Sequence, residues 1–318
     1  MRAIIEHMKN MNILVLGGNG FMGKNIQKTF ESSPYNMFYD SRRTGFDLYD
    51  LDLTIKKIKD TAPDVIIFAA ANVGNIGYVS ENAASVVNDN SQMYLNLYKA
   101  VSVVDPNIII INPISNCSYP GIIDVQHEEL WWDGEVHPSI ESYGFPKKLG
   151  YIISKCYKKQ YGIKTLNFIV PNAYGPHDYI DTGRTHALNG IIMRMIESQL
   201  NNQKEFLIWG TGTPVREWAY MPDVARLIKE VIDNGLYDMP NPINIGQENG
   251  VSILESSKMA RKALNYDVEF KFDTTKQDGA PIKVLGNKKF KQFFPNFTFT
   301  EVSEGIQHTI DYYKKHLL

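Results

Sequence analysis

The chain has 318 residues, with 33 Lys and Arg against 35 Asp and Glu, and a formal net charge of −2 at pH 7. This near-neutral balance excludes a strongly basic nucleic-acid-binding surface, and no apolar run approaches the ~20 residues that span a bilayer. The two cysteines, Cys117 and Cys156, exclude a disulfide framework, so we expect a cytoplasmic protein.

The first half of the chain alternates short apolar runs with helical patterns. Strands are expected at 12–16, 37–39, 65–69, 108–112 and 164–169. Helices are expected at 21–30, 82–105 and 143–161. Continuously apolar strands that alternate with helices indicate an α/β fold, with a Rossmann-type, doubly wound parallel sheet covered on both faces.

The pattern loosens after Pro171, where 172–185 is expected to be a loop. Further helices are expected at 186–199, 222–234, 252–264 and after 300, with strands at 206–208 and 243–245. This half predicts a smaller α/β lobe interleaved with the sheet domain. The expected boundaries are 8–171 and 215–247 for the sheet domain, 172–214 and 248–318 for the lobe, and 1–7 for an N-terminal extension.

Gly17, Gly20 and Gly23, spaced G-x-x-G-x-x-G, stand between the first predicted strand and the first predicted helix. Glycines allow the backbone to approach a pyrophosphate closely, and the helix N-terminus offers amide donors. This context predicts a dinucleotide site that includes Phe21 and Met22; the alternative is a tight turn in some other α/β protein.

The end of the second strand bears on the choice of cofactor. Asp40 suits the ribose 2′-hydroxyl of NAD, whereas Arg42 and Arg43 suit the 2′-phosphate of NADP. We favour NADP, and NAD is the alternative. If neither arginine binds a ligand, both are simply solvated in a turn. Asp47 and Leu48 are expected at the adenine edge.

Ser115 precedes a Tyr-x-x-x-Lys pair, Tyr143 and Lys147. Four residues make about one helical turn, so the phenol and the ammonium are expected to face the same way. The ammonium is expected to lower the pKa of Tyr143 toward neutrality and make it a usable acid. The glycine turn, the serine and the Tyr–Lys pair together supply what carbonyl reduction by a nicotinamide needs. The alternative for Ser115 is a serine that caps a turn at the end of a strand.

The chain resembles the extended short-chain dehydrogenase/reductase family, the NAD-dependent epimerases and dehydratases, over essentially its whole length. The resembling segments are 69–74 (AAANVG), 115–120 (SNCSYP), 143–147 (YGFPK), 172–178 (NAYGPHD), 209–217 (WGTGTPVRE) and 278–283 (DGAPIK). Their collinear order is most similar to the branch that epimerises and reduces a GDP-linked 4-keto-6-deoxyhexose. The resemblance implies that Ser115 and Tyr143 polarise the C4 carbonyl, that Lys147 holds the nicotinamide ribose, and that Ala69 and Ala71 contact the cofactor.

The resemblance also implies a proton-transfer pair, with Cys117 as base and His186 as acid at carbons 3 and 5 of the sugar. A thiol and an imidazole can both be tuned to titrate near pH 7. The alternatives are a small buried hydrophobe for Cys117 and a histidine with surface hydrogen bonds for His186.

Substrate contacts are implied for further residues of the smaller lobe. Arg194, Arg216 and Lys283 would meet the diphosphate of a GDP-linked 4-keto sugar, and Asn172 and Trp209 the sugar or the base. Surface solvation is the alternative for each single charge. The long helices at 82–105 and 143–161 are expected to form the four-helix seam of a homodimer. No metal site is expected.

The chain departs from the family pattern in three places. Asn19 stands where the relatives commonly carry arginine, which weighs against NADP, and Ile282 replaces an arginine beside Lys283, which leaves the nucleotide or sugar contact there open. The segment 178–185 differs along the expected sugar pocket, which allows a longer sugar such as a heptose. The alternatives are C4 reduction without epimerisation and, more distantly, a non-catalytic NADP-binding sensor. A 4,6-dehydratase is disfavoured, because such enzymes carry an acidic pair where this chain has Asn116-Cys117. A UDP-sugar 4-epimerase activity would explain neither Cys117 nor His186.

Overall fold

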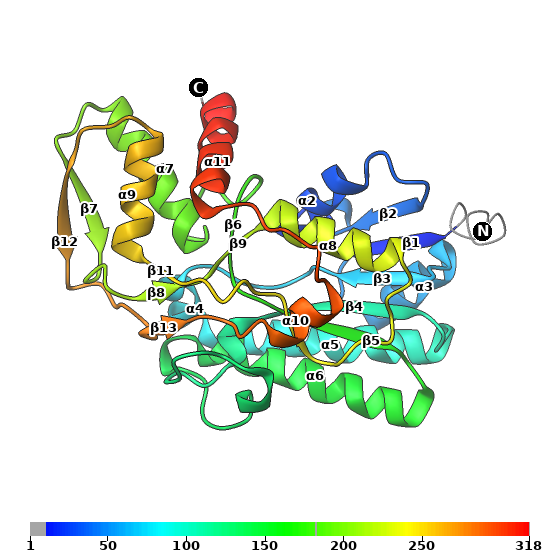
Figure 1. Ribbon diagram of the computed structural model, residues 1–318. Helices are drawn as coiled ribbons and strands as arrows, with labels where there is room; N and C mark the ends of the chain where they lie inside the picture. The colour runs from blue at the N-terminus through cyan, green and yellow to red at the C-terminus, as the bar shows by residue number, and fades with distance from the viewer. Residues whose placement is uncertain (1–10, 182, 318) are drawn as a thin grey trace.

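The computed structural model describes residues 11–181 and 183–317, and its larger domain is built on a six-stranded parallel sheet (Figure 1). The expected N-terminal extension lies outside the described residues. The strands are arranged in the order β10 (Ile243–Asn244), β5 (Thr165–Val170), β4 (Ile109–Ser115), β3 (Val65–Phe68), β1 (Asn12–Leu16) and β2 (Asn36–Asp40). All five pairings are parallel, so the predicted Rossmann-type α/β fold is confirmed.

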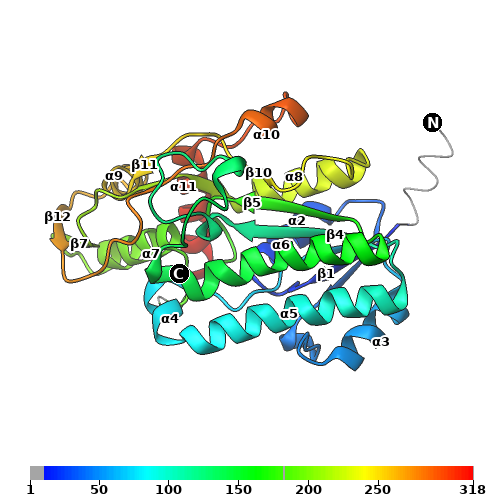
Figure 2. The same cartoon turned by 90° about the horizontal axis from the view of Figure 1, so that it is seen from below.

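Helices cover both faces of this sheet, as the apolar strands predicted. Ile13 and Val15 of β1 pack in the core beside α2 (Phe21–Phe30) and α8 (Met221–Asp233). The alternate residues Leu14 and Leu16 point to the other face. That face carries α3 (Leu51–Thr61), α5 (Ala83–Val104) and α6 (Glu141–Tyr161), and Figure 2 shows α5 and α6 lying side by side along it.

A smaller lobe with its own apolar core lies beside the sheet (Figure 1). Its helices are α7 (Ala187–Leu200), α9 (Ile253–Ala263) and α11 (Val302–Leu317), and β7 (Glu205–Trp209) pairs in parallel with β12 (Glu269–Asp273). In a three-stranded sheet, β8 (Val215–Arg216) lies between β11 (Val251–Ser252) and β13 (Ile282–Lys283). The predicted interleaved α/β lobe is therefore present.

Several short elements were not predicted from the sequence. The expectation of a loop throughout 172–185 is wrong at its start, because β6 (Asn172–Tyr174) pairs with the distant β9 (Trp218–Tyr220). Helix α3 was also missed, although Asp50 caps it by accepting a hydrogen bond from the Leu53 amide at 2.9 Å. The helices α4 (Ile76–Glu81) and α10 (Lys288–Phe293) complete the described helices.

Within the part of the chain that the structure describes, none of the helices combines the length and the apolar character that crossing a membrane requires.

Candidate active site

One cavity of about 910 Å³ opens between the carboxyl ends of the sheet strands and the smaller lobe. It is lined by all five residues predicted to be catalytic: Ser115, Cys117, Tyr143, Lys147 and His186. It is also lined by all five predicted to contact substrate: Asn172, Arg194, Trp209, Arg216 and Lys283. The fold therefore brings these residues to one place from segments far apart in the sequence.

The glycine turn is built for close backbone contact. Gly17 has φ +91°, and a Cβ there would lie 2.6 Å from the Ala70 amide nitrogen. A Cβ on Gly23 would lie 2.3 Å from the Gly17 carbonyl oxygen. Gly20 precedes the first turn of α2, and it lines the cavity together with Phe21, Met22, Ala69 and Ala71. This glycine-lined turn at a helix N-terminus fits the pyrophosphate of a dinucleotide.

Beyond the turn, the Asp40 carboxylate is already paired with the Lys57 ammonium at 3.0 Å. The Asp40 carbonyl accepts the amide hydrogens of Gly17 and Gly18, which ties the end of β2 to the glycine turn. Asn19 donates from Nδ2 to the Ser41 hydroxyl at 2.9 Å. The Asp40 carboxylate therefore already has a charged partner in this structure.

The two arginines that follow Asp40 are exposed at the surface. Arg42 pairs with Asp47 at 3.5 Å, and its guanidinium lies 4.2 Å from the centroid of the Tyr49 ring. Leu48 is buried in the core under α5. These predicted cofactor residues, Asp40 to Leu48, lie outside the lining of the cavity itself.

Ser115, Tyr143 and Lys147 occupy the positions that their spacing predicted. Ser115 ends β4, and its hydroxyl accepts the amide hydrogen of Cys117 at 3.2 Å. Tyr143 and Lys147 lie in the first turns of α6, and the lysine Nζ is 5.3 Å from the centroid of the tyrosine ring. The ammonium also donates to the Tyr94 hydroxyl at 3.4 Å, a contact that the sequence did not predict.

The expected lowering of the tyrosine pKa is wrong for this structure. Burial, followed by the charge of Cys117, raises the pKa of Tyr143 well above its ordinary value. Burial also lowers the pKa of Lys147 to about 8. Desolvation is the largest cause of the shift at both side chains. Tyr143 is therefore protonated at neutral pH, which is the form that donates a proton.

Cys117 lies in a 3₁₀ turn after β4, and its Sγ is 3.3 Å from the Nζ of Lys283. The ammonium that was expected at the diphosphate therefore contacts the thiol in this structure. Burial raises the pKa of Cys117, but Lys283, Arg216 and the hydrogen bond with Ser115 outweigh it and bring the pKa below its ordinary value. Burial lowers the pKa of Lys283.

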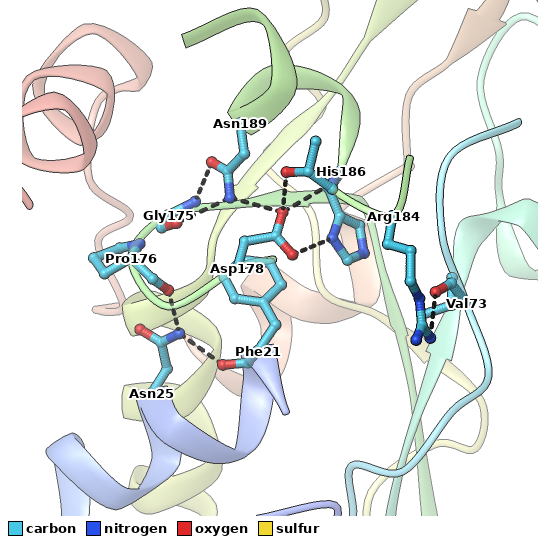
Figure 3. Close-up of polar contacts among 10 residues, drawn as sticks. Phe21, Asn25, Val73, Gly175, Pro176, Asp178, Arg184, His186 and Asn189 are labelled. Carbon is cyan, nitrogen blue, oxygen red and sulfur yellow. Dashed lines mark hydrogen bonds and ion pairs between the residues drawn. The ribbon is translucent and has the colours of Figure 1, made fainter. Parts of the chain in front are cut away.

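His186 stands immediately before α7 and is held by Asp178, as Figure 3 shows. Its Nδ1 lies 3.0 Å from one carboxylate oxygen, and its amide donates to the other at 2.8 Å. Thr185 and Asn189 donate to that second oxygen at 3.0 and 2.9 Å. Burial lowers the pKa of His186, but Asp178 outweighs it, so the pKa lies above its ordinary value.

Asp178 is a functional candidate that the sequence reasoning missed. Its side chain is fully buried, and its pKa is lowered because the charge and hydrogen bonds of His186 outweigh desolvation. With Nδ1 on the carboxylate, Nε2 is the nitrogen of His186 that is not bound to Asp178 and can exchange a proton. The sequence signals are its place at the end of the 172–178 segment and its spacing eight residues before the histidine, and neither marks the two residues as a pair.

Two arginines lie at the lobe side of the cavity, Arg216 buried and Arg194 half-buried. Arg194 stacks 4.3 Å from the centroid of Trp209 and donates to the Leu207 carbonyl at 2.7 Å. Arg216 donates to the carbonyls of Val215 and Asp278, at 2.8 and 3.2 Å. Burial lowers the pKa of Arg194 and of Arg216 to about 10. Partly or fully desolvated cations bound to neutral carbonyls favour an anionic ligand, because its charge would offset their desolvation.

A third arginine was also missed. The guanidinium of Arg184 lies between the rings of Tyr78 and Tyr179, with its carbon 4.9 and 4.7 Å from their centroids. It donates to the Val73 carbonyl at 3.3 Å, as Figure 3 shows. This contact joins the segment that differs from the family pattern to the loop after β3, at the wall of the cavity.

Comparison with known proteins agrees with this geometry. Residues 13–246 match the sequence profile of the NAD dependent epimerase/dehydratase family. The chain is 28% identical over 315 residues to the GDP-L-fucose synthase of Dictyostelium discoideum, with 97% of both chains covered. It is 29% identical over 311 residues to the GDP-L-colitose synthase of Yersinia pseudotuberculosis, with 95% of this chain and 98% of that protein covered.

A solved structure is similar over a comparable length. The GDP-L-fucose synthetase from Naegleria fowleri bound to NADP matches with a TM-score of 0.84 and 25% identity, covering 96% of this chain and 94% of that one. The family resemblance expected from the motifs is therefore confirmed.

Proposed function

This chain belongs to the NAD-dependent epimerase/dehydratase family, and from that premise we propose that it acts on a GDP-linked 4-keto sugar in the cytoplasm. It epimerises carbons 3 and 5 and then reduces the C4 ketone with NADPH. One observation carries the proposal. The cavity that holds Ser115, Tyr143 and Lys147 also holds two proton-transfer groups that each contact a charged partner, Cys117 with Lys283 and His186 with Asp178.

NADP(H) is the proposed cofactor, and when bound it supplies the hydride for C4. The glycine turn and the N-terminus of α2 would hold its pyrophosphate. Asp40 is engaged by Lys57, whereas Arg42 and Arg43 are exposed beside it, which favours a 2′-phosphate over a 2′-hydroxyl. The NADP in the Naegleria fowleri synthetase supports the same choice.

In the reduction, Ser115 donates a hydrogen bond to the C4 carbonyl oxygen and Tyr143 delivers the proton that completes the hydroxyl. The raised pKa of Tyr143 keeps the phenol protonated until the alkoxide forms. Lys147, at 3% exposure, lies beneath the phenol and would hold the nicotinamide ribose. General acid catalysis of this kind contributes roughly 10²- to 10⁴-fold in rate.

In the epimerisation, the ketone acidifies the hydrogens on carbons 3 and 5. The lowered pKa of Cys117 suits a base, and the raised pKa of His186 suits an acid. Cys117 comes from the end of β4, and His186 comes from the start of α7. Inversion needs one group to remove a proton and another to return it on the opposite face, which two groups from different elements can do.

Product analysis in heavy water tests this proposal. The protein is incubated with NADPH and a panel of GDP-4-keto sugars that includes a 6-deoxyhexose and a heptose, and the products are examined by NMR. We expect reduction at C4 with deuterium at C3 and C5. Tyr143→Phe should abolish reduction but keep exchange, whereas Cys117→Ser should abolish exchange but keep direct reduction.

The second candidate is C4 reduction without epimerisation, on a longer sugar such as a heptose. The Arg184 contact motivates it, because it places the segment expected to depart from the family pattern in the wall of the cavity. Reduction of a GDP-4-keto-heptose without deuterium at C3 or C5 would select this alternative. Tight NADPH binding with no turnover of any sugar would leave only a cofactor-binding protein.

We also propose a homodimer through α5 and α6. These adjacent helices expose large apolar side chains, among them Leu95 at 45% and Phe145 at 60%. Burying such side chains against a second copy is favourable by ~25 cal/mol per Å². Light scattering should give twice the chain mass for the wild type, and Leu95→Lys should shift the mass toward the monomer; a monomeric wild type would exclude the seam.

A further inference from the structure

We propose that Lys283 is a positioning residue that holds Cys117 as a thiolate before any substrate binds. The sugar would then meet a preformed thiolate–ammonium pair rather than a neutral thiol that must first lose its proton. This inference rests on the proposed role of Cys117 as a base, and it assigns Lys283 to the thiol instead of the diphosphate.

The backbone fixes both members of this pair. Lys283 lies on β13 opposite Arg216 of β8, and its carbonyl accepts the Glu217 amide hydrogen at 2.8 Å. On the other side, the Cys117 amide donates to Ser115, and a Cβ on Gly144 would lie 2.4 Å from the Cys117 carbonyl oxygen. With the backbone held at both ends, Nζ lies 3.3 Å from Sγ.

Because Lys283 is buried, the charge state of Cys117 affects how well the lysine ammonium is stabilised. Lys283 is 7% exposed, so its ammonium has given up most of its hydration. A desolvated cation is costly unless an anion or a strong acceptor faces it, and a thiolate accepts a far stronger hydrogen bond than a thiol. Arg216, at 6% exposure, adds a second positive charge nearby.

The other ionisable groups around Cys117 respond to its charge. On α6, burial and then the charge of Cys117 raise the pKa of Tyr143, whereas burial lowers the pKa of Lys147 and the charge of Cys117 opposes that shift. On the segment before α6, burial and then Lys283 and Arg216 lower the pKa of His137, which keeps that imidazole neutral. The cations that face the thiol, Lys283, Arg216 and Lys147, therefore favour the thiolate, and the thiolate favours a protonated Tyr143.

The proton balance of the step is simple. The thiolate forms an S–H bond with a proton from a carbon beside the ketone, the C–H bond breaks, and its electron pair moves into the enolate at C4. Lys283 keeps its proton throughout. Once Cys117 is neutral, the ammonium has lost its anion, so return of the proton from sulfur to solvent or sugar restores the more stable pair.

The pH dependence of Cys117 alkylation measures how strongly Lys283 stabilises the thiolate. In a Cys156→Ser background, Cys117 is the only thiol, and its rate of reaction with iodoacetamide follows the thiolate fraction. We expect Lys283→Met and Lys283→Gln to move the midpoint upward by at least ~1 pH unit, or about tenfold less thiolate near neutrality. Lys283→Arg should restore most of the low midpoint.

Lys276→Met is the matched control, because Lys276 lines the same cavity but lies 5.8 Å from the centroid of Trp209. It should leave the thiol midpoint unchanged, and NADPH binding should confirm that every variant is folded. Equal midpoints in the parent and in both uncharged Lys283 variants would overturn the proposal, as would a shift of the same size in the Lys276 control.

This readout separates the inference from the proposed function. A midpoint that rises in the Lys283 variants, with no deuterium at C3 or C5 in the wild type, supports the thiolate pair and overturns the epimerase. Deuterium exchange in the wild type, with a midpoint that does not respond to Lys283, overturns the pair and supports the epimerase.

Discussion

The Nδ1 of His186 and the Oδ1 of Asp178 lie 3.0 Å apart, and the second oxygen of the same carboxylate receives the His186 amide hydrogen. The carboxylate therefore fixes both the orientation of the ring and the nitrogen that carries the inner proton. It also favours the imidazolium, which raises the pKa of His186. In the proposed reaction, this contact favours the protonated form of the acid of the pair.

Asp178→Asn should move the pH dependence of epimerisation. The imidazolium is the active form of His186, so exchange falls as pH rises through its pKa. Removing the carboxylate lowers that pKa, and the alkaline limb of deuterium exchange should shift to lower pH by about 1 unit or more. The measurement is the pH profile of exchange at C3 and C5, with the His186 pKa followed by NMR.

Asp181→Asn is the control for this variant, because Asp181 lies in the same loop and accepts the Gly183 amide hydrogen rather than His186. An unchanged alkaline limb in Asp178→Asn, or an equal shift in the control, would contradict the assigned role of Asp178.

The same contact predicts how stability depends on pH. The pKa of His186 is raised on folding, so its contribution is complete below the ordinary histidine value of ~6.5 and is lost as pH rises through the folded pKa. The pKa of Asp178 is lowered, so its contribution is complete above ~3.9 and is lost as pH falls through the folded pKa. Asp178→Asn should therefore lower the free energy of unfolding most between about pH 4 and 6.5. Denaturant titrations across this range check it, and a loss that is constant with pH would count against the ion pair.

Elements of the fold were predictable wherever the sequence signal is local. The strands of the large sheet are continuous apolar runs, and the glycine turn needs only its own backbone, so both were predicted. The strands β6 and β13 have two or three residues and exist because a distant strand pairs with them, which no local pattern reveals.

The features of the site also divide into those that local spacing predicts and those that depend on distant elements. The Tyr143–Lys147 spacing is one helical turn and was predicted, whereas the partners of the key groups lie on other elements. Asp178 meets His186 across a loop, Lys283 meets Cys117 from another sheet, and Tyr94 meets Lys147 from α5. The direction of the Tyr143 pKa was wrong because it depends on burial, which spacing alone does not supply.

Gly23→Ala should abolish cofactor binding. The added Cβ would lie 2.3 Å from the Gly17 carbonyl oxygen and 2.5 Å from that of Gly18, so the turn has to open. Overpacking of this kind costs about 1–3 kcal/mol, and the displaced amides no longer fit a pyrophosphate. NADPH titrations should show at least a hundredfold weaker binding, whereas Lys28→Ala on the exposed face of α2 should bind normally; equal affinities would exclude the turn as the pyrophosphate site.

Arg42→Ala and Arg43→Ala should separate the two nicotinamide cofactors. Both side chains are exposed near the end of β2, and Arg42 is only loosely held by Asp47 at 3.5 Å. Either guanidinium can turn to a 2′-phosphate, where a charge-assisted hydrogen bond contributes roughly 1.5–3 kcal/mol. We expect KM for NADPH to rise more than tenfold in at least one variant while KM for NADH changes little. Equal changes for both cofactors would reverse the preference for NADP.

Tyr94→Phe should shift the pH profile of reduction through Lys147. The Tyr94 hydroxyl accepts from the lysine ammonium at 3.4 Å and donates to Asn112 at 3.1 Å. Removing this acceptor disfavours the ammonium, whose pKa burial already lowers to about 8. Because the charged lysine is the active form, the fall of kcat with rising pH should begin at lower pH than in the wild type.

Two further variants test whether the shift comes from the position of the Tyr94 hydroxyl or from a general loss of stability. A Cβ on Gly150 would lie 2.5 Å from the Tyr94 ring, so Gly150→Ala should push the phenol away from Lys147 and shift the profile in the same direction. Tyr98→Phe removes a buried hydroxyl one turn along α5, which bonds Thr165 at 3.0 Å, and it should cost about 1 kcal/mol of stability without moving the profile. If Tyr98→Phe moves the profile as much as Tyr94→Phe, the effect comes from loss of stability and Tyr94 does not position the lysine.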